Sequence, residues 1–168
     1  STTNELKPGK TVEKTGTYLV EDKQAEYNVF VNMNQAKLSD GKTIYAEDVF
    51  GSALIFLKDT LKVYEYTGTG IPKNTSTEWT ELSSADYSFT YDGSARKLKL
   101  VLPDGKALKL VYRADINQAI GGTLDASNST NSFSLKGYTG SNSSDDTNFG
   151  TTVQKPTVWS NSDVTSVT

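Results

Sequence analysis

The sequence contains neither cysteine nor histidine, and methionine occurs once. Without cysteine the chain can form no disulfide and has no thiol nucleophile. Without histidine as well, the usual zinc sites and every histidine-based catalytic triad are excluded. No apolar run approaches the roughly 20 residues that a membrane-spanning helix needs. The formal net charge of −3 argues against nucleic acid and anionic membranes as main partners. We expect no metal and no other cofactor.

A length of 168 residues suits one domain with a tail. We expect a single domain over residues 8–160. The polar tail over residues 161–168 is expected to be a linker to a following domain. The first residues form no signal peptide and lack an initiator methionine, so we expect a fragment or a processed form.

The composition favours strands. Serine and threonine make up roughly a quarter of the chain, well above average usage, and tyrosine occurs nine times. Thr, Tyr, Val and Phe are common in strands, and turn residues recur about every 8–15 positions. Alternation of apolar and polar residues predicts strands at residues 12–14, 25–31, 44–48, 53–57, 61–66, 87–91, 97–102, 107–112, 131–135 and 151–159. The predicted fold is all-β, an antiparallel β-sandwich.

The connecting segments carry their own predictions. The turn sequence Pro-Asp-Gly-Lys at residues 103–106 predicts a hairpin between the strands on either side. Residues 67–78 are rich in Gly, Thr, Pro, Asn and Ser and predict a loop, and residues 137–146 predict a flexible loop for the same reason. Residues 115–121 could hold one helical turn.

Three polar residues occupy positions that the alternation assigns to the core. Lys14 is in phase with Val12, and Asp48 is in phase with Ile44 and Ala46, whereas Glu47 faces outward. Asn131 is likewise in phase with the apolar residues of its strand. Each would cost several kcal/mol if buried alone, but together they can satisfy one another.

The same three side chains can also react. Burial lowers the pKa of a lysine and raises the pKa of an aspartate, so that both become neutral. A neutral Lys14 amine is a nucleophile, and a protonated Asp48 can polarise the Asn131 carboxamide. Attack on that carbon expels ammonia and leaves an amide cross-link, with proximity supplying most of the rate. The pattern alone also fits a lysine that reaches solvent at a strand end, an aspartate in a turn and an asparagine in a loop.

Several short segments match, in order, the motifs of a known family. The segments are Val-Glu-Lys-Thr-Gly at 12–16, Tyr-Asn-Val-Phe-Val-Asn at 27–32, Lys-Thr-Ile-Tyr-Ala-Glu-Asp-Val-Phe at 42–50, Leu-Lys-Val-Tyr at 61–64, Leu-Val-Tyr-Arg-Ala at 110–114 and Asn-Ser-Phe-Ser-Leu-Lys-Gly at 131–137. Over roughly residues 10–160 the chain resembles the collagen-adhesin A-type isopeptide domains of Gram-positive surface proteins and pilins. It departs from them at Val49-Phe50, where the family more often has Thr and then Leu.

The resemblance implies roles for individual residues. Lys14 would be the amine donor, Asn131 the acceptor and Asp48 the catalytic acid of an intramolecular isopeptide bond. Rival assignments are Lys10 as donor, with Asn128 and Glu47 for the other two roles. The resemblance also implies an immunoglobulin-like β-sandwich.

The family also implies a setting. Such domains are structural units of cell-wall-anchored stalks, adhesins and pilus shafts, so the expected location is the cell wall or surface of a Gram-positive bacterium. The expected partners are neighbouring domains of the same surface protein. The alternative is an adhesin module that binds a host matrix protein or a glycan. Because the cross-link would form only once in each chain, we do not expect a turnover enzyme, and no carboxylate pair is marked as a hydrolase site.

Overall fold

The structure is a computed structural model that describes residues 11–39, 41–136, 144–147, 149 and 151–152. The ends of the predicted domain, the predicted linker at 161–168 and most of the strand predicted at 151–159 lie outside the described residues. The strands are β1 (Val12–Leu19), β2 (Gln24–Val31), β3 (Thr43–Phe50), β4 (Leu54–Tyr66), β5 (Trp79–Glu81), β6 (Ser88–Asp92), β7 (Lys97–Pro103), β8 (Leu108–Ile116), β9 (Thr123–Leu124), β10 (Asn131–Lys136), β11 (Ser144–Thr147) and β12 (Thr151–Thr152).

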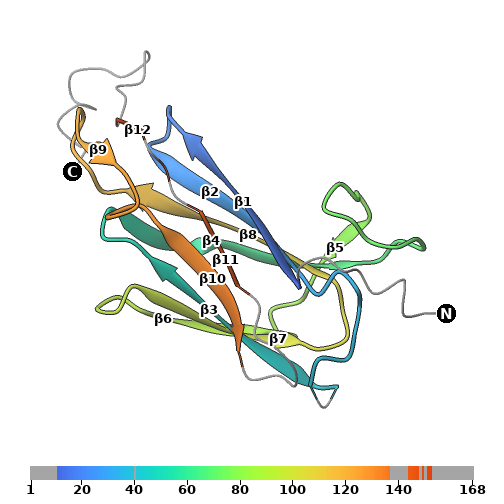
Figure 1. The fold of residues 1–168 in the computed structure, drawn as a ribbon. Coiled ribbons are helices and arrows are strands. Elements are labelled where there is room, and N and C mark those ends of the chain that lie inside the picture. The colour runs from blue at the N-terminus through green and yellow to red at the C-terminus, as the bar shows by residue number, and fades with distance from the viewer. Residues whose placement is uncertain (1–10, 40, 137–143, 148, 150, 153–168) are drawn as a thin grey trace.

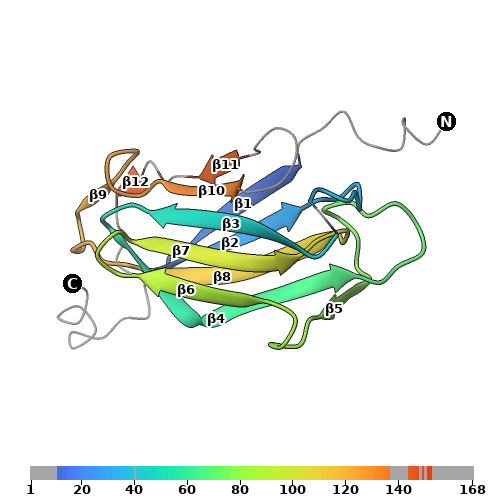
Figure 2. The ribbon, with the colours of Figure 1, turned by 90° about the horizontal axis from the view of Figure 1, so that it is seen from below.

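Two antiparallel five-stranded sheets pack face to face (Figures 1 and 2). Sheet A has the strand order β1-β2-β8-β4-β5, and sheet B has the order β11-β10-β3-β7-β6. A small ladder pairs β12 with β9. The predicted antiparallel β-sandwich is confirmed. No helix in the described part of the chain is long and apolar enough to cross a membrane.

The core forms where alternate residues of both sheets meet. Along β7 and β8 every second residue is buried, including Leu98, Leu100, Leu108 and Leu110. The hairpin predicted across residues 103–106 is wrong, because β7 belongs to sheet B and β8 to sheet A. Two strands with one apolar face can share a core either within one sheet or across two sheets, and the alternation is the same in both cases.

The turn between β7 and β8 is held by a buried carboxylate. Asp104 accepts hydrogen bonds from the backbone N–H groups of Leu38 and Ser39 (both 2.8 Å), of Gly41 (3.1 Å) and of Gly105 (2.8 Å). It therefore ties the chain that leaves sheet B to the loop that enters β3. Gly105 has a φ of 77°, a left-handed conformation that favours glycine at this turn.

Other predicted connections differ in detail. The strands predicted at 53–57 and 61–66 are one strand, β4, with a register shift between Leu57 and Lys62. At this bulge the Thr60 hydroxyl accepts a hydrogen bond from the Arg113 N–H (2.9 Å) and donates one to the Leu57 carbonyl (2.6 Å). These side-chain bonds let one strand continue through the irregularity.

Two further predictions are corrected. Residues 144–146 belong to the predicted loop at 137–146 but lie in β11, which pairs with β10. Residues 115–121 contain the end of β8 and no helical turn; a turn from Ala119 to Gly122 follows, closed by a backbone hydrogen bond of 2.8 Å. The short strands β5 and β9 were not predicted, because two or three residues carry too little alternation to detect.

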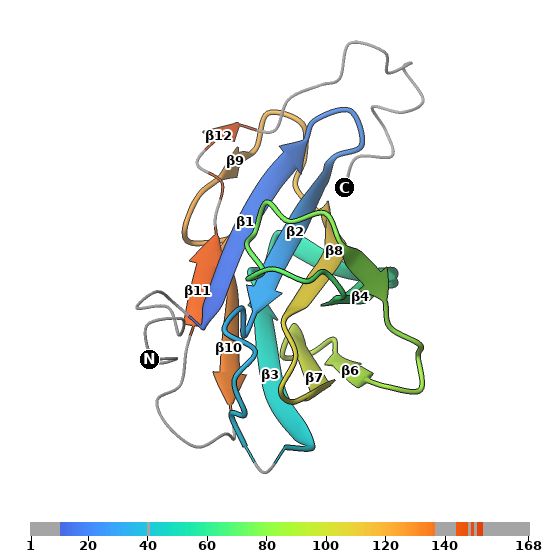
Figure 3. The ribbon, with the colours of Figure 1, turned by 90° about the vertical axis from the view of Figure 1, so that its right-hand side faces the viewer.

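The edges of the two sheets meet beside the N-terminal strand. Figure 3 shows β1, the edge of sheet A, lying next to β11 and β10 of sheet B. A side chain that points inward from β1 therefore reaches side chains from sheet B.

Candidate functional site

Three polar side chains from three strands meet inside the sandwich. Lys14 lies on β1, Asp48 on β3 and Asn131 at the start of β10. The strands β3 and β10 are hydrogen-bonded neighbours in which Asp48 pairs with Phe133 and Asn131 with Phe50. Asp48 and Asn131 have no exposed surface, and the side chain of Lys14 is also fully buried. The alternation that predicted burial placed all three correctly.

The amine of Lys14 faces the Asn131 carboxamide directly. Lys14 Nζ donates to Asn131 Oδ1 and also to the backbone carbonyl of Asn131 at 2.8 Å. It lies 3.4 Å from Asp48 Oδ2. The other oxygen of Asp48, Oδ1, accepts a hydrogen bond from Asn131 Nδ2. Each of the three groups thus contacts the other two.

Two buried tyrosines wall the site. The hydroxyl of Tyr112 donates to Asp48 Oδ2, and the ring of Tyr27 has Lys14 Nζ 5.0 Å from its centroid. Phe50 packs against both tyrosines, with ring centroids 6.2 Å from Tyr27 and 6.1 Å from Tyr112. The apolar walls exclude water, which strengthens the electrostatic interactions among the polar groups.

No sequence pattern predicts the contact between Tyr112 and Asp48. A tyrosine in phase with leucines on a strand is an ordinary core residue, and nothing in the pattern shows that its hydroxyl reaches an aspartate on the other sheet. Tyr112 and Asp48 lie 64 residues apart in the chain. Only the packing of the two sheets brings them together.

The electrostatics favour a neutral Asp48. Burial raises the pKa of Asp48 above its usual range, although Lys14 and the hydrogen bonds from Tyr112 and Asn131 oppose that shift. Burial and the neighbouring Asp48 raise the pKa of Tyr112 well above its usual value. The tyrosine therefore keeps its proton, and the carboxyl can hold one as well.

The arrangement can support proton transfer at both ends of an amide exchange. Asp48 presents Oδ2 to the lysine amine and Oδ1 to the carboxamide nitrogen of Asn131. A carboxyl group placed in this way can accept a proton on one oxygen and release one from the other. The reacting groups are in contact before any reaction, which is the arrangement that gives the highest effective concentrations.

The rival residues lie elsewhere. Glu47 is on the outward face of β3, where its Oε1 lies 3.6 Å from Lys97 Nζ. Asn128 lies in a turn, where its side chain bonds to the backbone of Asp125 (3.0 Å) and Thr123 (2.9 Å). Lys10 lies outside the described residues. In the described part of the chain, no cluster of three or more acidic residues could hold a metal ion.

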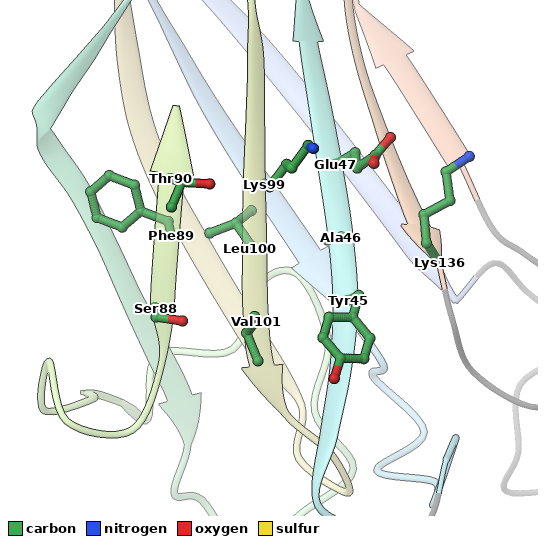
Figure 4. Close-up of a pocket in the computed structure, with 10 residues that line it drawn as sticks. All are labelled: Tyr45, Ala46, Glu47, Ser88, Phe89, Thr90, Lys99, Leu100, Val101 and Lys136. Carbon is green, nitrogen blue, oxygen red and sulfur yellow. The ribbon is translucent and has the colours of Figure 1, made fainter. Parts of the chain in front are cut away.

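A shallow groove lies on the opposite side of sheet B, facing away from the core. It has a volume of about 300 Å³ and crosses β6, β7, β3 and the end of β10 (Figure 4). Tyr45, which is 47% exposed, stands at one side with Lys136 nearby, and Lys99 and Val101 rise from the middle. None of the trio lines the groove, because Asp48 and Asn131 project from the other face of sheet B and Lys14 comes from sheet A.

The chain matches no protein-family model, and no curated protein sequence matches it. Among solved structures it is similar to a collagen-binding domain from a Staphylococcus aureus adhesin, with 15% identity, a TM-score of 0.59, and coverage of 86% of this chain and 99% of that one. It is also similar to ACE19, the collagen binding subdomain of the Enterococcus faecalis surface protein ACE (14% identity, TM-score 0.56, 84% and 96% covered).

A third similar structure is the collagen binding domain of the Erysipelothrix rhusiopathiae surface protein RspB. The identity is 14% and the TM-score 0.62, over 86% of this chain and 47% of that one. The chain thus spans the whole of the first two domains and about half of the third protein. At these identities the likeness establishes a shared fold.

Proposed function

We propose that this chain is a structural domain of a Gram-positive cell-surface protein, a stalk or adhesin unit, stabilised by a self-made amide bond between Lys14 and Asn131. The observation that carries the proposal is the contact between the Lys14 amine and the Asn131 carboxamide, with Asp48 touching both. The likeness of the fold to domains of bacterial surface adhesins supports the setting.

The reaction begins with transfer of one proton from the Lys14 ammonium to the Asp48 carboxylate, which leaves a neutral amine and a neutral acid. The amine nitrogen attacks Cγ of Asn131, and the carbonyl electron pair moves to oxygen. Asp48 takes a proton from the attacking nitrogen at Oδ2 and gives its own proton from Oδ1 to Nδ2 of Asn131. The bond between Cγ and Nδ2 breaks, the carbonyl re-forms and ammonia leaves. At this point Asp48 is the neutral acid formed in the first step; the departing ammonia takes up that proton and leaves as ammonium, so Asp48 returns to the carboxylate and one secondary amide has formed.

The product gives the domain what a disulfide gives other secreted domains. The bond would close a loop between residues separated by 117 positions. On the loop-entropy model used for disulfides, such a closure stabilises the fold by about 5 kcal/mol. It needs no oxidant, and it suits a chain without cysteine that is exposed outside the cell. The partners in this proposal are the neighbouring domains of the same cell-wall-anchored protein.

The test is the intact mass of the purified, denatured chain. We expect a mass below the sequence value by about 17 Da, the loss of one ammonia, because a covalent bond survives unfolding. Lys14→Arg and Asp48→Ala should each restore the full mass. Lys23→Arg is the matched control, since Lys23 is also buried but donates to the carbonyl of Gln118 instead. A full mass for the unsubstituted chain would refute the proposal, and a loss of about 18 Da would show that a carboxyl group is the acceptor.

A second candidate function is favoured by the groove on sheet B. An adhesin module that binds a host matrix protein or a glycan needs an exposed surface with aromatic and polar groups, and the groove offers Tyr45 beside Lys99 and Lys136. The three structures described above are themselves named as collagen-binding domains or subdomains. The two functions are compatible, because the trio lies between the two sheets and the groove lies on the outer face of sheet B.

Binding to surfaces coated with collagen and to a glycan array tests this second function. Tyr45→Ala should reduce any binding at least about fivefold. Ile55→Ala is the matched control, because Ile55 is equally exposed (46%) but lies on sheet A. Equal loss in both variants, or no binding to any surface, would count against the groove as the binding site.

A further inference from the structure

Two tyrosines beside the trio are equally buried but have different hydroxyl contacts. Tyr27 on β2 and Tyr112 on β8 are directly paired across the sheet, and neither has exposed surface. Their ring centroids are 5.6 Å apart. The Tyr112 hydroxyl donates to Asp48 Oδ2, whereas the Tyr27 hydroxyl is buried with no hydrogen-bond partner among the residues that the structure describes. The two rings are both fully buried, but Tyr112 contacts Asp48 through its hydroxyl, whereas Tyr27 contacts Lys14 through its ring.

The contact with Tyr112 makes the two oxygens of Asp48 unequal. Oδ2 receives the tyrosine O–H and lies near the lysine amine, while Oδ1 faces the nitrogen that leaves Asn131. Among the described residues, Oδ2 accepts hydrogen bonds from two donors, the Tyr112 hydroxyl and the Lys14 amine, and Oδ1 accepts from one, Asn131 Nδ2. The oxygen with more donors is the less basic of the two. The single proton of a neutral Asp48 then lies on Oδ1, where the leaving group needs it. The same hydrogen bond resists rotation of the carboxyl group.

We propose that the Tyr112 hydroxyl is a positioning group for cross-link formation. It keeps the Asp48 proton on Oδ1, so that Oδ2 carries no proton and can receive one from the Lys14 amine. This inference rests on the proposed function, since it concerns the same reaction. Tyr112 itself exchanges no proton with the reacting atoms. It acts only through the orientation and the acidity of Asp48.

A tyrosine that only fills space would leave the pH dependence of the reaction unchanged, whereas loss of the Tyr112 hydroxyl should change it. The Tyr112 hydrogen bond lowers the pKa of Asp48 against the larger effect of burial, so its removal raises that pKa further. The groups that surround Asp48 from the packed strands are Lys14 on β1, Tyr27 on β2, Tyr91 on β6, Leu98 on β7, Tyr112 on β8 and Asn131 on β10. Tyr27 and Tyr91 both have a raised pKa because of burial, so neither titrates in the range where Asp48 does.

The experiment follows the loss of ammonia during refolding. The full chain is isolated in urea before it reacts, diluted into buffers from pH 5 to pH 9 (a range of about four units around neutrality), quenched at intervals and weighed. Tyr112→Phe is compared with Tyr87→Phe, which removes the hydroxyl of a partly buried tyrosine that packs against the same core but whose charged neighbours are Glu81 and Lys62. Tryptophan fluorescence reports in parallel that each variant has folded.

We expect Tyr112→Phe to form the bond about tenfold more slowly than the unsubstituted chain, with the alkaline limb of its pH–rate profile moved to higher pH. Tyr87→Phe should keep the original rate and profile. If Tyr112→Phe does not fold, 3-fluorotyrosine at position 112 keeps the hydroxyl but makes it a stronger donor, and should move the same limb to lower pH.

The results separate this inference from the proposed function. Loss of about 17 Da in the unsubstituted chain, with an unchanged rate and profile in Tyr112→Phe, would overturn the positioning role alone. Equal slowing in both phenylalanine variants would also overturn it, because packing rather than the hydroxyl would then be responsible. A full mass in the unsubstituted chain would refute the proposed function, and the inference with it.

Discussion

Two buried aspartates have pKa values shifted in opposite directions from that of an ordinary aspartate. Asp48 sits between the sheets among side chains, and burial raises its pKa. Asp104 sits at the turn between β7 and β8, where burial alone would raise its pKa, but four backbone N–H groups lower it overall. The difference shows that backbone donors suit a carboxylate that must stay charged, whereas a site built from side chains and rings can keep the acid protonated.

The two residues therefore have different uses. Asp104 satisfies the backbone of two loops and contributes stability as an anion. Asp48 accepts hydrogen bonds from Lys14, Tyr112 and Asn131, the groups beside the proposed reaction. Five measurements test this contrast, and their expected effects decrease from the first to the last.

The largest effect is expected from Asp48→Asn. The asparagine has nearly the same volume, so no cavity forms, but it cannot relay protons between Lys14 and Asn131. We expect the full mass and a free energy of unfolding lower by about 5 kcal/mol, the contribution of the closed loop. Guanidinium unfolding together with intact mass measures both. A lower mass in this variant would show that Asp48 is not the proton relay.

Asp104→Ala should destabilise the domain without touching the cross-link. Four hydrogen bonds from backbone N–H groups to a charged acceptor are lost, and we expect a fall of about 3 kcal/mol in the free energy of unfolding. The mass should remain about 17 Da below the sequence value. The same unfolding and mass measurements apply, and a restored mass would contradict the independence of the two aspartates.

The pH dependence of stability should have opposite signs at the two residues. The folded-state pKa of Asp104 is depressed, so its stabilisation is present above the unfolded value of about 3.9 and is lost as the pH falls through the lower folded value. The advantage of the unsubstituted chain over Asp104→Asn should therefore shrink below about pH 4.

Asp48 should show the reverse in a background that cannot cross-link. Its folded-state pKa is raised, so the folded chain is penalised as the pH rises from about 3.9 through the folded value. Comparing Lys14→Arg with Lys14→Arg/Asp48→Asn by thermal unfolding from pH 3 to pH 7 (about four units), we expect the double variant to gain relative stability with rising pH. A gap that is constant with pH would mean that the pKa of Asp48 is not shifted.

The smallest effect is expected from Glu47→Gln. Glu47 precedes Asp48 on β3 but points outward, and its ion pair with Lys97 is 3.6 Å long and partly exposed. Exposed pairs of this kind contribute at most about 1 kcal/mol, so stability should change by less than that and the lower mass should persist. Thermal unfolding and intact mass provide the check. A full mass would show that Glu47, and not Asp48 alone, is needed for the cross-link.

The sequence was informative wherever a property repeats every second residue. Alternation placed Lys14, Asp48 and Asn131 on the inner faces, and it separated Asp48 from its neighbour Glu47. It could not show which strands pair. The residues that flank Asp104 read as a hairpin, although they connect two sheets. The pairing depends on how a whole set of apolar faces packs, which is a property of the complete chain.

The contacts that could not be predicted from the sequence join residues that are distant in the chain. The backbone groups that bind Asp104 include three that lie 63 to 66 residues away. Tyr112 contacts an acid on the opposite sheet. Neither the contacts of Asp104 nor that of Tyr112 follow from a local pattern. An aspartate before glycine, as at Asp104, is also typical of an ordinary turn.

The loop at residues 67–78 lies between Lys14 and Asn131 in the chain and stands to one side of the sandwich in Figure 1. Exposed loops of this composition are the usual places where proteases cut. With Lys14 joined to Asn131, the residues between them form a macrocycle, and a single cut in the loop opens the macrocycle without dividing the molecule. The two fragments would stay covalently attached, so that a surface protein built from such domains would survive a nick that severs a linear chain.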